Sequence, residues 1–183
     1  MKHDAQTIVC CLIGDPVDHS LSPSIHNAAY VALGLNYMYT AFRVTKLQEA
    51  LGGIRALGIR GVSVTAPHKT RVMAYLDEID ETAQIIGAVN TIVHTDGILK
   101  GYNTDSSGAI AALEEKIILK GKRIVLLGAG GAARAIAYGL EQKGSDVLIL
   151  NRTVEHAQKI AHITHARYGD LSQIAEIKKS DVL

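Results

Sequence analysis

The 183-residue chain has few aromatic residues: no tryptophan, one phenylalanine and seven tyrosines, 4% in all. Proteins bind single-stranded nucleic acid largely by stacking bases on aromatic side chains, so this scarcity argues against that class of protein. The chain also lacks an excess of charge, because 19 Lys and Arg against 18 Asp and Glu leave a net charge of +1. No basic run is present to attract nucleic acid or an anionic membrane surface. We therefore expect a small-molecule partner, no nucleic acid and no membrane.

Long hydrophobic runs and a cysteine framework are missing as well. The longest apolar stretch, residues 124–140, contains Arg134 and four glycines, which argues against a membrane span. Cys10 and Cys11 are adjacent in a short apolar run and are typical of buried thiols in a reducing compartment. The amino-terminal residues do not have the pattern of a secretory signal. We expect a cytoplasmic protein, monomeric or homodimeric.

Patterns of strands and helices alternate along the chain. The continuous apolar run at 7–13 is typical of a strand buried on both faces, and Ser22-Pro23 predicts the start of a helix with Ser22 as its N-cap. Asp96-Gly97 between two strand-like runs predicts a hairpin. Further strands are predicted at 37–44, 61–65, 90–94, 98–102, 123–127, 146–150 and 166–168, and helices at 47–57 (with Leu47, Leu51, Ile54 and Leu57 on one face), 70–76, 81–86, 106–116, 130–143 and 154–163.

This alternation predicts an α/β fold with a mostly parallel sheet, to which the hairpin adds antiparallel strands. We divide the chain into a substrate-binding and catalytic domain, residues 1–103, and a Rossmann-type dinucleotide-binding domain, residues 104–183. The chain stops at residues 181–183, which resemble the opening of another strand. From this we expect the second domain to be incomplete at its carboxyl end and the 183-residue chain alone to be inactive.

A glycine-rich segment follows the apolar strand that ends at Leu127 and fits the pattern G-x-G-x-x-A. In such loops the first glycine permits a tight turn and the second lets the backbone approach a pyrophosphate. The alanine lets the helix pack on the strand, and the positive helix end faces the phosphates. The predicted cofactor-binding residues of this loop are Gly128, Ala129, Gly130, Gly131 and Ala132, with Ala133 as the packing residue.

The end of the next strand indicates which dinucleotide binds. An NAD site usually has an acidic residue about twenty positions beyond the glycine loop, where it binds the ribose hydroxyls. Here the strand is followed by Asn151, Arg152 and Thr153, with no carboxylate. Arg152 can bind the adenosine 2′-phosphate with a charge-assisted fork, so the sequence predicts NADP.

Two charged residues follow predicted strand ends, where open α/β sheets bind ligands. They are Lys69 and Asp105. Oxidation of an alcohol requires removal of the hydroxyl proton, which one positioned acid–base residue can perform. An unperturbed lysine is a poor base at neutral pH, so residue type leaves open whether Lys69 carries the proton or is a charged orienter.

Hydroxyl and amide side chains lie near these charges in the predicted fold. Ser20 and Ser22 precede a helix, where hydroxyls and free backbone amides suit a carboxylate. Thr65 and Asn90 could bond substrate hydroxyls, or equally the backbone. The histidines do not form a convincing metal site, and we expect surface or cleft-wall positions for His26 and His68.

Several segments together resemble one family, the shikimate dehydrogenases. They are Ser20-Leu-Ser22-Pro23, Val64-Thr65-x-Pro67-x-Lys69, Gly87-Ala-Val-Asn90-Thr91, Asn103-Thr-Asp105, the glycine loop and Asn151-Arg152-Thr153. The resemblance implies NADP-linked interconversion of shikimate and 3-dehydroshikimate in the chorismate pathway to the aromatic amino acids. It also implies residue roles: Ser20 and Ser22 for the substrate carboxylate, Thr65, Lys69, Asn90 and Asp105 for its ring hydroxyls, Lys69 and Asp105 as the catalytic pair, and Asn151, Arg152 and Thr153 for the 2′-phosphate.

The chain departs from the family pattern in two places. It has Ser63 where the family usually has asparagine, so a loop hydrogen bond or a substrate contact is expected to differ. The family also continues beyond this chain and there supplies a glutamine to the substrate. Three alternatives stay open: a relative that oxidises quinate or another cyclic hydroxy acid, a non-catalytic ligand-binding module, and a fragment of a longer or multifunctional chain.

Overall fold

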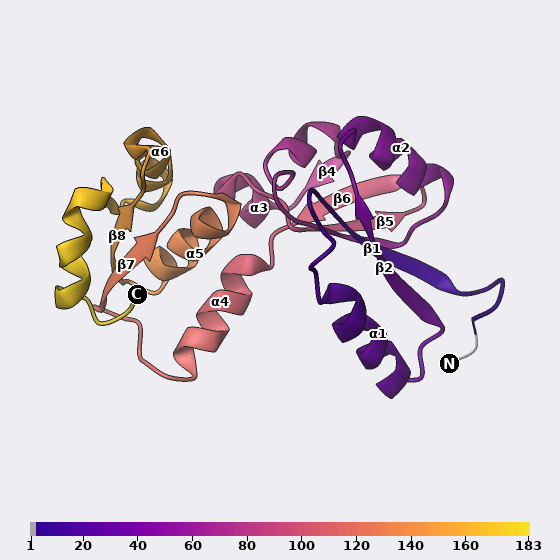
Figure 1. Ribbon diagram of the computed structural model, residues 1–183, viewed down its shortest axis with the longest axis horizontal. Coiled ribbons are helices and arrows are strands. Elements are labelled where there is room, and N and C mark those ends of the chain that lie inside the picture. Colours follow the sequence, from indigo (N-terminus) through magenta and orange to yellow (C-terminus); the bar gives the residue numbers. More distant parts are fainter. Residues whose placement is uncertain (1–2) are drawn as a thin grey trace. The chain divides into compact units, whose positions relative to one another are not determined.

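The computed structural model describes residues 3–183, which divide into two compact units. The first unit runs to Gln84 and includes Ala88–Tyr102, and the second consists of Ile85–Gly87 and Asn103–Leu183. Each unit contains its own β-sheet with helices packed against it (Figure 1). The described residues contain no helix that is both long and apolar enough to cross a membrane.

The first unit is built on a six-stranded sheet in the order β2-β1-β3-β5-β6-β4. Strand β1 runs parallel to β2 and β3, β5 runs antiparallel to β3 and β6, and the short β4 runs parallel to β6. The elements are β1 (Ile8–Gly14), α1 (Ser22–Ala32), β2 (Tyr37–Arg43), α2 (Leu47–Ala56), β3 (Gly61–Val64), the 3₁₀ helix η1 (Arg71–Tyr75), β4 (Glu78–Ile79), α3 (Glu81–Ile86), β5 (Thr91–Thr95) and β6 (Ile98–Tyr102).

The predicted hairpin is confirmed at β5 and β6. Asp96 and Gly97 have φ values of 50° and 84°, the positive values that a tight two-residue hairpin turn of type I′ requires. The helical segment predicted at 70–76 is a 3₁₀ helix at residues 71–75. One prediction in this unit is corrected: Leu57 is 77% exposed, because α2 ends one residue earlier and the chain turns at Gly58, with φ 64°.

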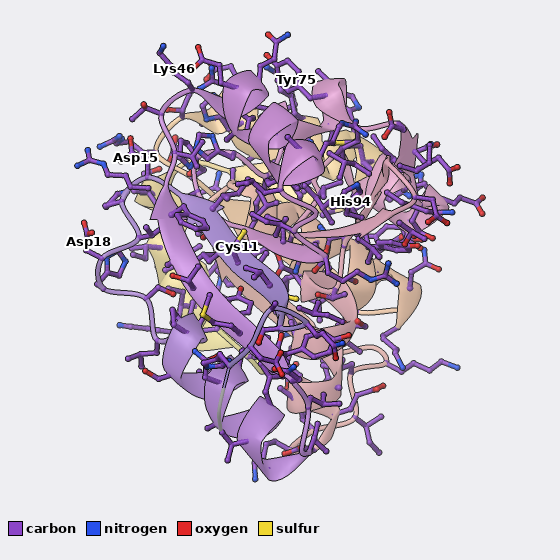
Figure 2. The ribbon with its side chains drawn as sticks, turned by 90° about the vertical axis from the view of Figure 1, so that its right-hand side faces the viewer. Cys11, Asp15, Asp18, Lys46, Tyr75 and His94 are labelled. Atoms are coloured by element: carbon purple, nitrogen blue, oxygen red, sulfur yellow. The ribbon has the colours of Figure 1, made fainter. Side chains whose placement is uncertain are left out.

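Strand β1 is buried on both faces, as its apolar run predicted. Cys11 and Ile13 pack with residues of α2 in one cluster, whereas Cys10 and Leu12 pack with Tyr39 in another, on the face that α1 covers. Figure 1 shows α1 and α2 on opposite sides of this sheet, and Figure 2 shows Cys11 inside the unit. Both cysteines are buried free thiols, which confirms that prediction.

The second unit has a parallel sheet in the order β7-β8-β9. Its main core joins α4, α5 and α6 to one face of this sheet, while the 3₁₀ helix η2 packs on the other. The predicted strand opening near the end of the chain is one parallel bridge between Val182 and Ile124. The elements are α4 (Asp105–Glu114), β7 (Arg123–Leu127), α5 (Gly131–Gln142), β8 (Asp146–Leu150), α6 (Val154–Thr164), β9 (Arg167–Gly169) and η2 (Leu171–Lys179).

Candidate active site and cofactor site

A pocket of about 400 Å³ with both polar and apolar walls opens in the first unit where β1 and β3 end. Three of the predicted substrate-binding residues, Ser20, Ser22 and Thr65, line it. Parallel strands place their carboxyl ends at one edge of a sheet, and ligand crevices of open α/β sheets lie there. The pocket therefore has the position and the hydroxyl groups of a site for a small polar molecule.

The two serines adopt an arrangement that the sequence did not predict. The N-cap of α1 is Leu21, whose side chain offers no capping oxygen, and Ser22 is the first helical residue. The prediction of Ser22 as N-cap is therefore wrong. The Ser22 backbone N–H donates to the Ser20 hydroxyl at 3.2 Å, and the two hydroxyl oxygens also lie 3.2 Å apart. Both hydroxyls are thus gathered at the positive end of a helix, a favourable place for an anion.

Backbone hydrogen bonds hold the loop that carries Thr65 and Lys69. The Thr65 N–H donates to the carbonyl of Ile13 at the end of β1, and the Lys69 carbonyl accepts from Val89 at 2.8 Å. The loop is therefore tied to the end of β1 at Thr65 and to the segment before β5 at Lys69.

Asn90, the fourth predicted substrate-binding residue, directly precedes β5. Its carbonyl accepts from Val64 at 2.7 Å, and its N–H donates to Tyr102 at 3.0 Å. Its side-chain oxygen accepts from the Thr91 hydroxyl at 2.9 Å. Since Val64 directly precedes Thr65, this strand end brings Asn90 to the same edge of the sheet as the Thr65 loop.

Asp15 and His19 also line the pocket, and sequence reasoning did not assign them to the site. Asp15 forms an ion pair with Arg43 at 2.6 Å, so part of its charge is offset at the pocket edge. The sequence feature that could have assigned Asp15 to the site is its position directly after a buried strand, where ligand crevices lie. For His19 that feature is its position next to Ser20.

Asp105 is the first residue of α4 and belongs to the second unit. Its N–H donates to the side-chain oxygen of Asn103 at 3.0 Å, which fixes the start of that helix. Lys69 belongs to the first unit. The catalytic pairing of Lys69 with Asp105 therefore stays a prediction.

Of the two histidines for which a position was predicted, His68 differs from expectation and His26 is partly exposed. His68 is only 2% exposed, so its predicted place at a surface or cleft wall is wrong. His26 stacks on the Tyr39 ring, with the ring centroids 4.2 Å apart. Among residues 3–183, no group of three or more His, Cys, Asp or Glu is placed to hold a metal ion.

The predicted glycine loop joins β7 to α5 in the second unit. Gly128 has a φ of 102°, which side-chain-bearing residues rarely adopt, and its N–H donates to Leu150 at the end of β8. Gly130 is the N-cap of α5 and has no side chain to occupy the amides of the first turn. The space into which a side chain would extend from either glycine is open. This open backbone at a helix amino end fits the pyrophosphate of a dinucleotide.

Asn151, Arg152 and Thr153 follow β8 at the same edge as the glycine loop. The Asn151 side-chain amide donates to the Thr153 carbonyl at 2.7 Å, and Thr153 is the N-cap of α6. Arg152 lies between them and is exposed. The structure thus brings both parts of the predicted cofactor site to the ends of β7 and β8, and an exposed guanidinium fits a phosphate group.

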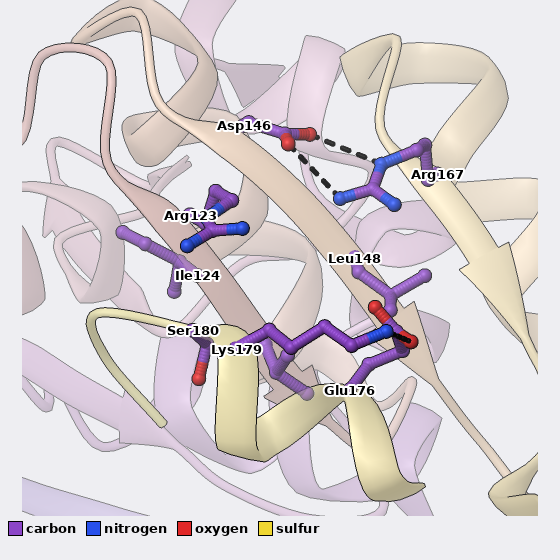
Figure 3. A pocket seen from close by; sticks show the side chains of 9 residues that line it. Arg123, Ile124, Asp146, Leu148, Arg167, Glu176, Lys179 and Ser180 are labelled. Carbon is purple, nitrogen blue, oxygen red and sulfur yellow. Dashed lines mark hydrogen bonds and ion pairs between the residues drawn. The ribbon is translucent and has the colours of Figure 1, made fainter. Parts of the chain in front are cut away.

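The second unit contains a pocket of about 230 Å³ whose lining includes several charged side chains (Figure 3). Arg123, Asp146 and Arg167, each the first residue of its strand, lie at the opposite end of the sheet from the glycine loop. Asp146 and Arg167 form a two-bond fork at 3.1 and 2.9 Å. Because ligand sites of such sheets lie at the carboxyl ends of the strands, we do not assign this pocket to the cofactor.

The fold and these two groups of residues define a class of protein: two α/β units, one with a hydroxyl-lined pocket and one with a Rossmann-type dinucleotide loop. Residues 12–92 match the family model of the shikimate dehydrogenase substrate binding domain, and residues 111–183 match that of shikimate / quinate 5-dehydrogenase. The chain belongs to the shikimate dehydrogenase family.

Individual relatives agree with this assignment. The chain is 47% identical to shikimate dehydrogenase (NADP(+)) of Methanothermobacter thermautotrophicus over 97% of its own length, and 55% identical to that of Methanocaldococcus jannaschii over 86%. It spans 66% and 57% of the lengths of these two proteins.

Solved structures resemble it closely too. The shikimate dehydrogenase of Aquifex aeolicus matches with a TM-score of 0.94 and 39% identity, covering 99% of this chain and 69% of that one. The shikimate 5-dehydrogenase of Thermus thermophilus, solved in complex with NADP(H) and shikimate, matches with a TM-score of 0.82 and 41% identity. That match covers 88% of this chain and 62% of the other.

Proposed function

We propose that this chain carries the substrate and cofactor sites of an NADP-dependent shikimate dehydrogenase, which reversibly reduces 3-dehydroshikimate to shikimate in aromatic amino-acid biosynthesis. The observation that carries the proposal is the single pocket lined by Ser20, Ser22 and Thr65 at the strand ends. The names of the relatives and the ligands of the Thermus thermophilus structure support the choice of substrate and cofactor.

The proposal assigns substrate binding and cofactor binding to different parts of the chain. Residues 1–103 bind and orient the substrate, and residues 104–183 bind NADP. The passage of the chain from the first compact unit to the second at Asn103 supports this division. A cytoplasmic setting, with the protein as a monomer or homodimer, belongs to the same proposal and is supported by the free buried thiols.

The first part binds shikimate through its carboxylate and its ring hydroxyls. Ser20 and Ser22 hold the carboxylate, because their hydroxyls lie together at the positive end of α1. Thr65 and Asn90 bond ring hydroxyls from the two strand ends that frame the pocket edge. The ring is thereby oriented with one hydroxyl towards Lys69 and Asp105.

The chemical step removes a hydride from a ring carbon and a proton from its hydroxyl. NADP, when bound, supplies the hydride acceptor. Lys69 takes the hydroxyl proton at its Nζ and returns it in the reverse reaction, while Asp105 orients the lysine and the hydroxyl. The backbone bonds of the Lys69 loop reduce the movement needed to reach this geometry.

The second part fits NADP at two places. The backbone at Gly128, Ala129, Gly130, Gly131 and Ala132 receives the pyrophosphate, since it is open and faces a helix amino end. Arg152 binds the 2′-phosphate, and Asn151 and Thr153 flank it at the start of α6. This cation is the feature that selects NADP over NAD.

The test is shikimate-dependent reduction of NADP, followed by NADPH absorbance. It is run in a parent protein that carries this chain together with the coding sequence that follows residue 183, and in its Lys69→Ala variant. Loss of a general acid–base residue lowers turnover by about a hundredfold to ten-thousandfold, while NADP binding by the second unit should persist. Lys46→Ala is the matched control, because Lys46 is an exposed lysine of the same unit paired with Glu49.

Near-normal turnover in Lys69→Ala would remove this lysine from the chemistry. Quinate is assayed in parallel, and a preference for quinate would move the substrate to the other cyclic hydroxy acid. Shikimate binding without turnover in the parent would favour a ligand-binding module instead.

A further inference from the structure

The loop that carries Thr65 and Lys69 contains a histidine whose ring is directed into the protein interior. We propose that His68 is a positioning residue, which holds Lys69 in place for proton transfer through a side-chain hydrogen bond to the end of β2. The inference rests on the proposed function, in which Lys69 moves the hydroxyl proton. His68 itself is 2% exposed and therefore does not touch the substrate.

The hydrogen bond of the His68 ring has a defined direction. Nε2 lies 2.7 Å from the carbonyl oxygen of Val44, and a carbonyl oxygen can only accept, so Nε2 carries the hydrogen and donates. The other ring nitrogen, Nδ1, is buried and has no hydrogen-bond partner among residues 3–183. The imidazole is thus anchored by one directed bond.

This bond ties the loop to a third strand. Val44 follows β2, and its N–H donates to Gly14 at the end of β1. The Thr65 N–H reaches β1 and the Lys69 carbonyl reaches the segment before β5. His68 supplies the link to β2, and it is a link made by a side chain, so a substitution can remove it and leave the backbone bonds in place.

His68 directly precedes Lys69, and backbone hydrogen bonds of this loop restrain the residues next to both. The His68 N–H donates to the Thr65 carbonyl at 2.9 Å, and its carbonyl accepts from Val72 at the same distance. The ring bond, the Thr65 bond and the Lys69 bond therefore hold five consecutive residues. A displacement of about 1 Å at a reacting group can reduce turnover by about a hundredfold, so an anchor at this place affects rate more than affinity.

The experiment compares two substitutions of His68 with a matched control in the same parent protein, which carries this chain together with the coding sequence that follows residue 183. His68→Phe fills a similar space but cannot donate, which leaves the Val44 carbonyl buried and unpaired. His68→Gln retains a side-chain N–H that can reach the same oxygen. His94→Phe is the control, because His94 Nδ1 contacts the Ile59 carbonyl at 3.1 Å in the same unit, away from the Lys69 loop.

We expect His68→Phe to lower kcat by about tenfold to a hundredfold with a smaller change in KM and unchanged NADP binding. His68→Gln should recover most of kcat, and His94→Phe should keep the parent kcat. Amide hydrogen exchange, which needs no turnover, should accelerate at Thr65, Val72 and Val89 in His68→Phe only.

Each outcome bears on the proposal. Parent kcat in a folded His68→Phe chain, or no local change in hydrogen exchange, would overturn it. Equal loss of kcat in His68→Phe and His68→Gln would overturn it as well, because the donated bond would then be irrelevant. If His68→Phe does not fold, His68→Leu, which is smaller and likewise cannot donate to the Val44 carbonyl, takes its place in the kcat and exchange measurements. A parent with normal hydrogen exchange but no shikimate oxidation would contradict the proposed function, and the exchange and shikimate-binding data of the variants would still test the anchor.

Discussion

Replacement of Arg152 by alanine should change the cofactor preference of the second unit. Arg152 is exposed and lies directly after β8, between Asn151 and Thr153. The Asn151 side-chain amide donates to the Thr153 carbonyl, and Thr153 is the N-cap of α6. The neighbours hold the backbone through their own bonds. The substitution therefore removes a guanidinium and leaves the shape of the site.

The size of the effect follows from the type of bond. A hydrogen bond to a charged group contributes about 1.5–3 kcal/mol, and about 1.4 kcal/mol corresponds to a tenfold change in affinity. Arg152 is exposed to solvent, which screens its charge and places the effect towards the lower limit. We expect NADP to bind about tenfold to a hundredfold more weakly, and NAD, which has no 2′-phosphate, to be little affected.

Equilibrium titration with NADP and with NAD measures both affinities without a need for turnover. Arg123→Ala is the matched control, because Arg123 is an exposed arginine of the same unit at the opposite end of the sheet (Figure 3). The salt dependence should agree: the difference between NADP and NAD in the parent should shrink as ionic strength rises.

Equal weakening of NADP and NAD would refute this reasoning, since Arg152 would then contact a part common to both cofactors or support the fold. No weakening of either would place the 2′-phosphate elsewhere. Loss of NADP affinity in Arg123→Ala would show that the effect is one of general charge.

Three further predictions concern stability and reactivity. Gly139→Ala should destabilise the chain by about 1–2 kcal/mol, because the new Cβ would lie 2.6 Å from side-chain atoms of α4, whereas Gly108→Ala, with open space around it, should be neutral or stabilising in thermal unfolding. Burial raises the pKa of the Cys11 thiol to about 12, so at neutral pH this thiol should be alkylated only in the unfolded chain, as mass spectrometry can measure. The hydrogen bond from Arg55 holds the pKa of Asp77 below its ordinary value of 3.8, so this carboxylate stabilises the fold above that pH and the stabilisation is lost as the pH falls through the lower, folded value. Asp77→Asn should therefore be less stable than the parent at neutral pH and equal to it in strong acid, as urea unfolding at several pH values can show.

Each of these predictions has a clear contrary result. Gly139→Ala as stable as the parent would mean that α4 can shift without cost. Rapid alkylation of Cys11 in the folded chain would mean that β1 opens readily, and a stability difference for Asp77→Asn that persists in acid would exclude the charge as its cause.

Much of the fold could be predicted because its signals are local. The apolar run of β1, the Asp96-Gly97 turn and the glycine loop each depend on residue types within a few positions, and all three occur as predicted. Where the prediction of a helix start was wrong, the backbone conformation of a neighbouring residue was the cause. Leu21 adopts helical angles before α1, so Ser22 lies within the helix and its N–H donates to the Ser20 hydroxyl.

In the candidate site, too, some residues could be predicted from the local sequence and others could not. Ser20, Ser22 and Thr65 could be assigned to one pocket in advance, because they follow strands whose carboxyl ends coincide in a parallel sheet. The burial of His68 could not be predicted, because it depends on the Val44 carbonyl, 24 positions away, and a histidine between proline and lysine has the composition of a surface loop. A sequence therefore indicates which chemical groups a strand end presents, whereas the contacts that hold those groups still come from segments that only the fold brings together.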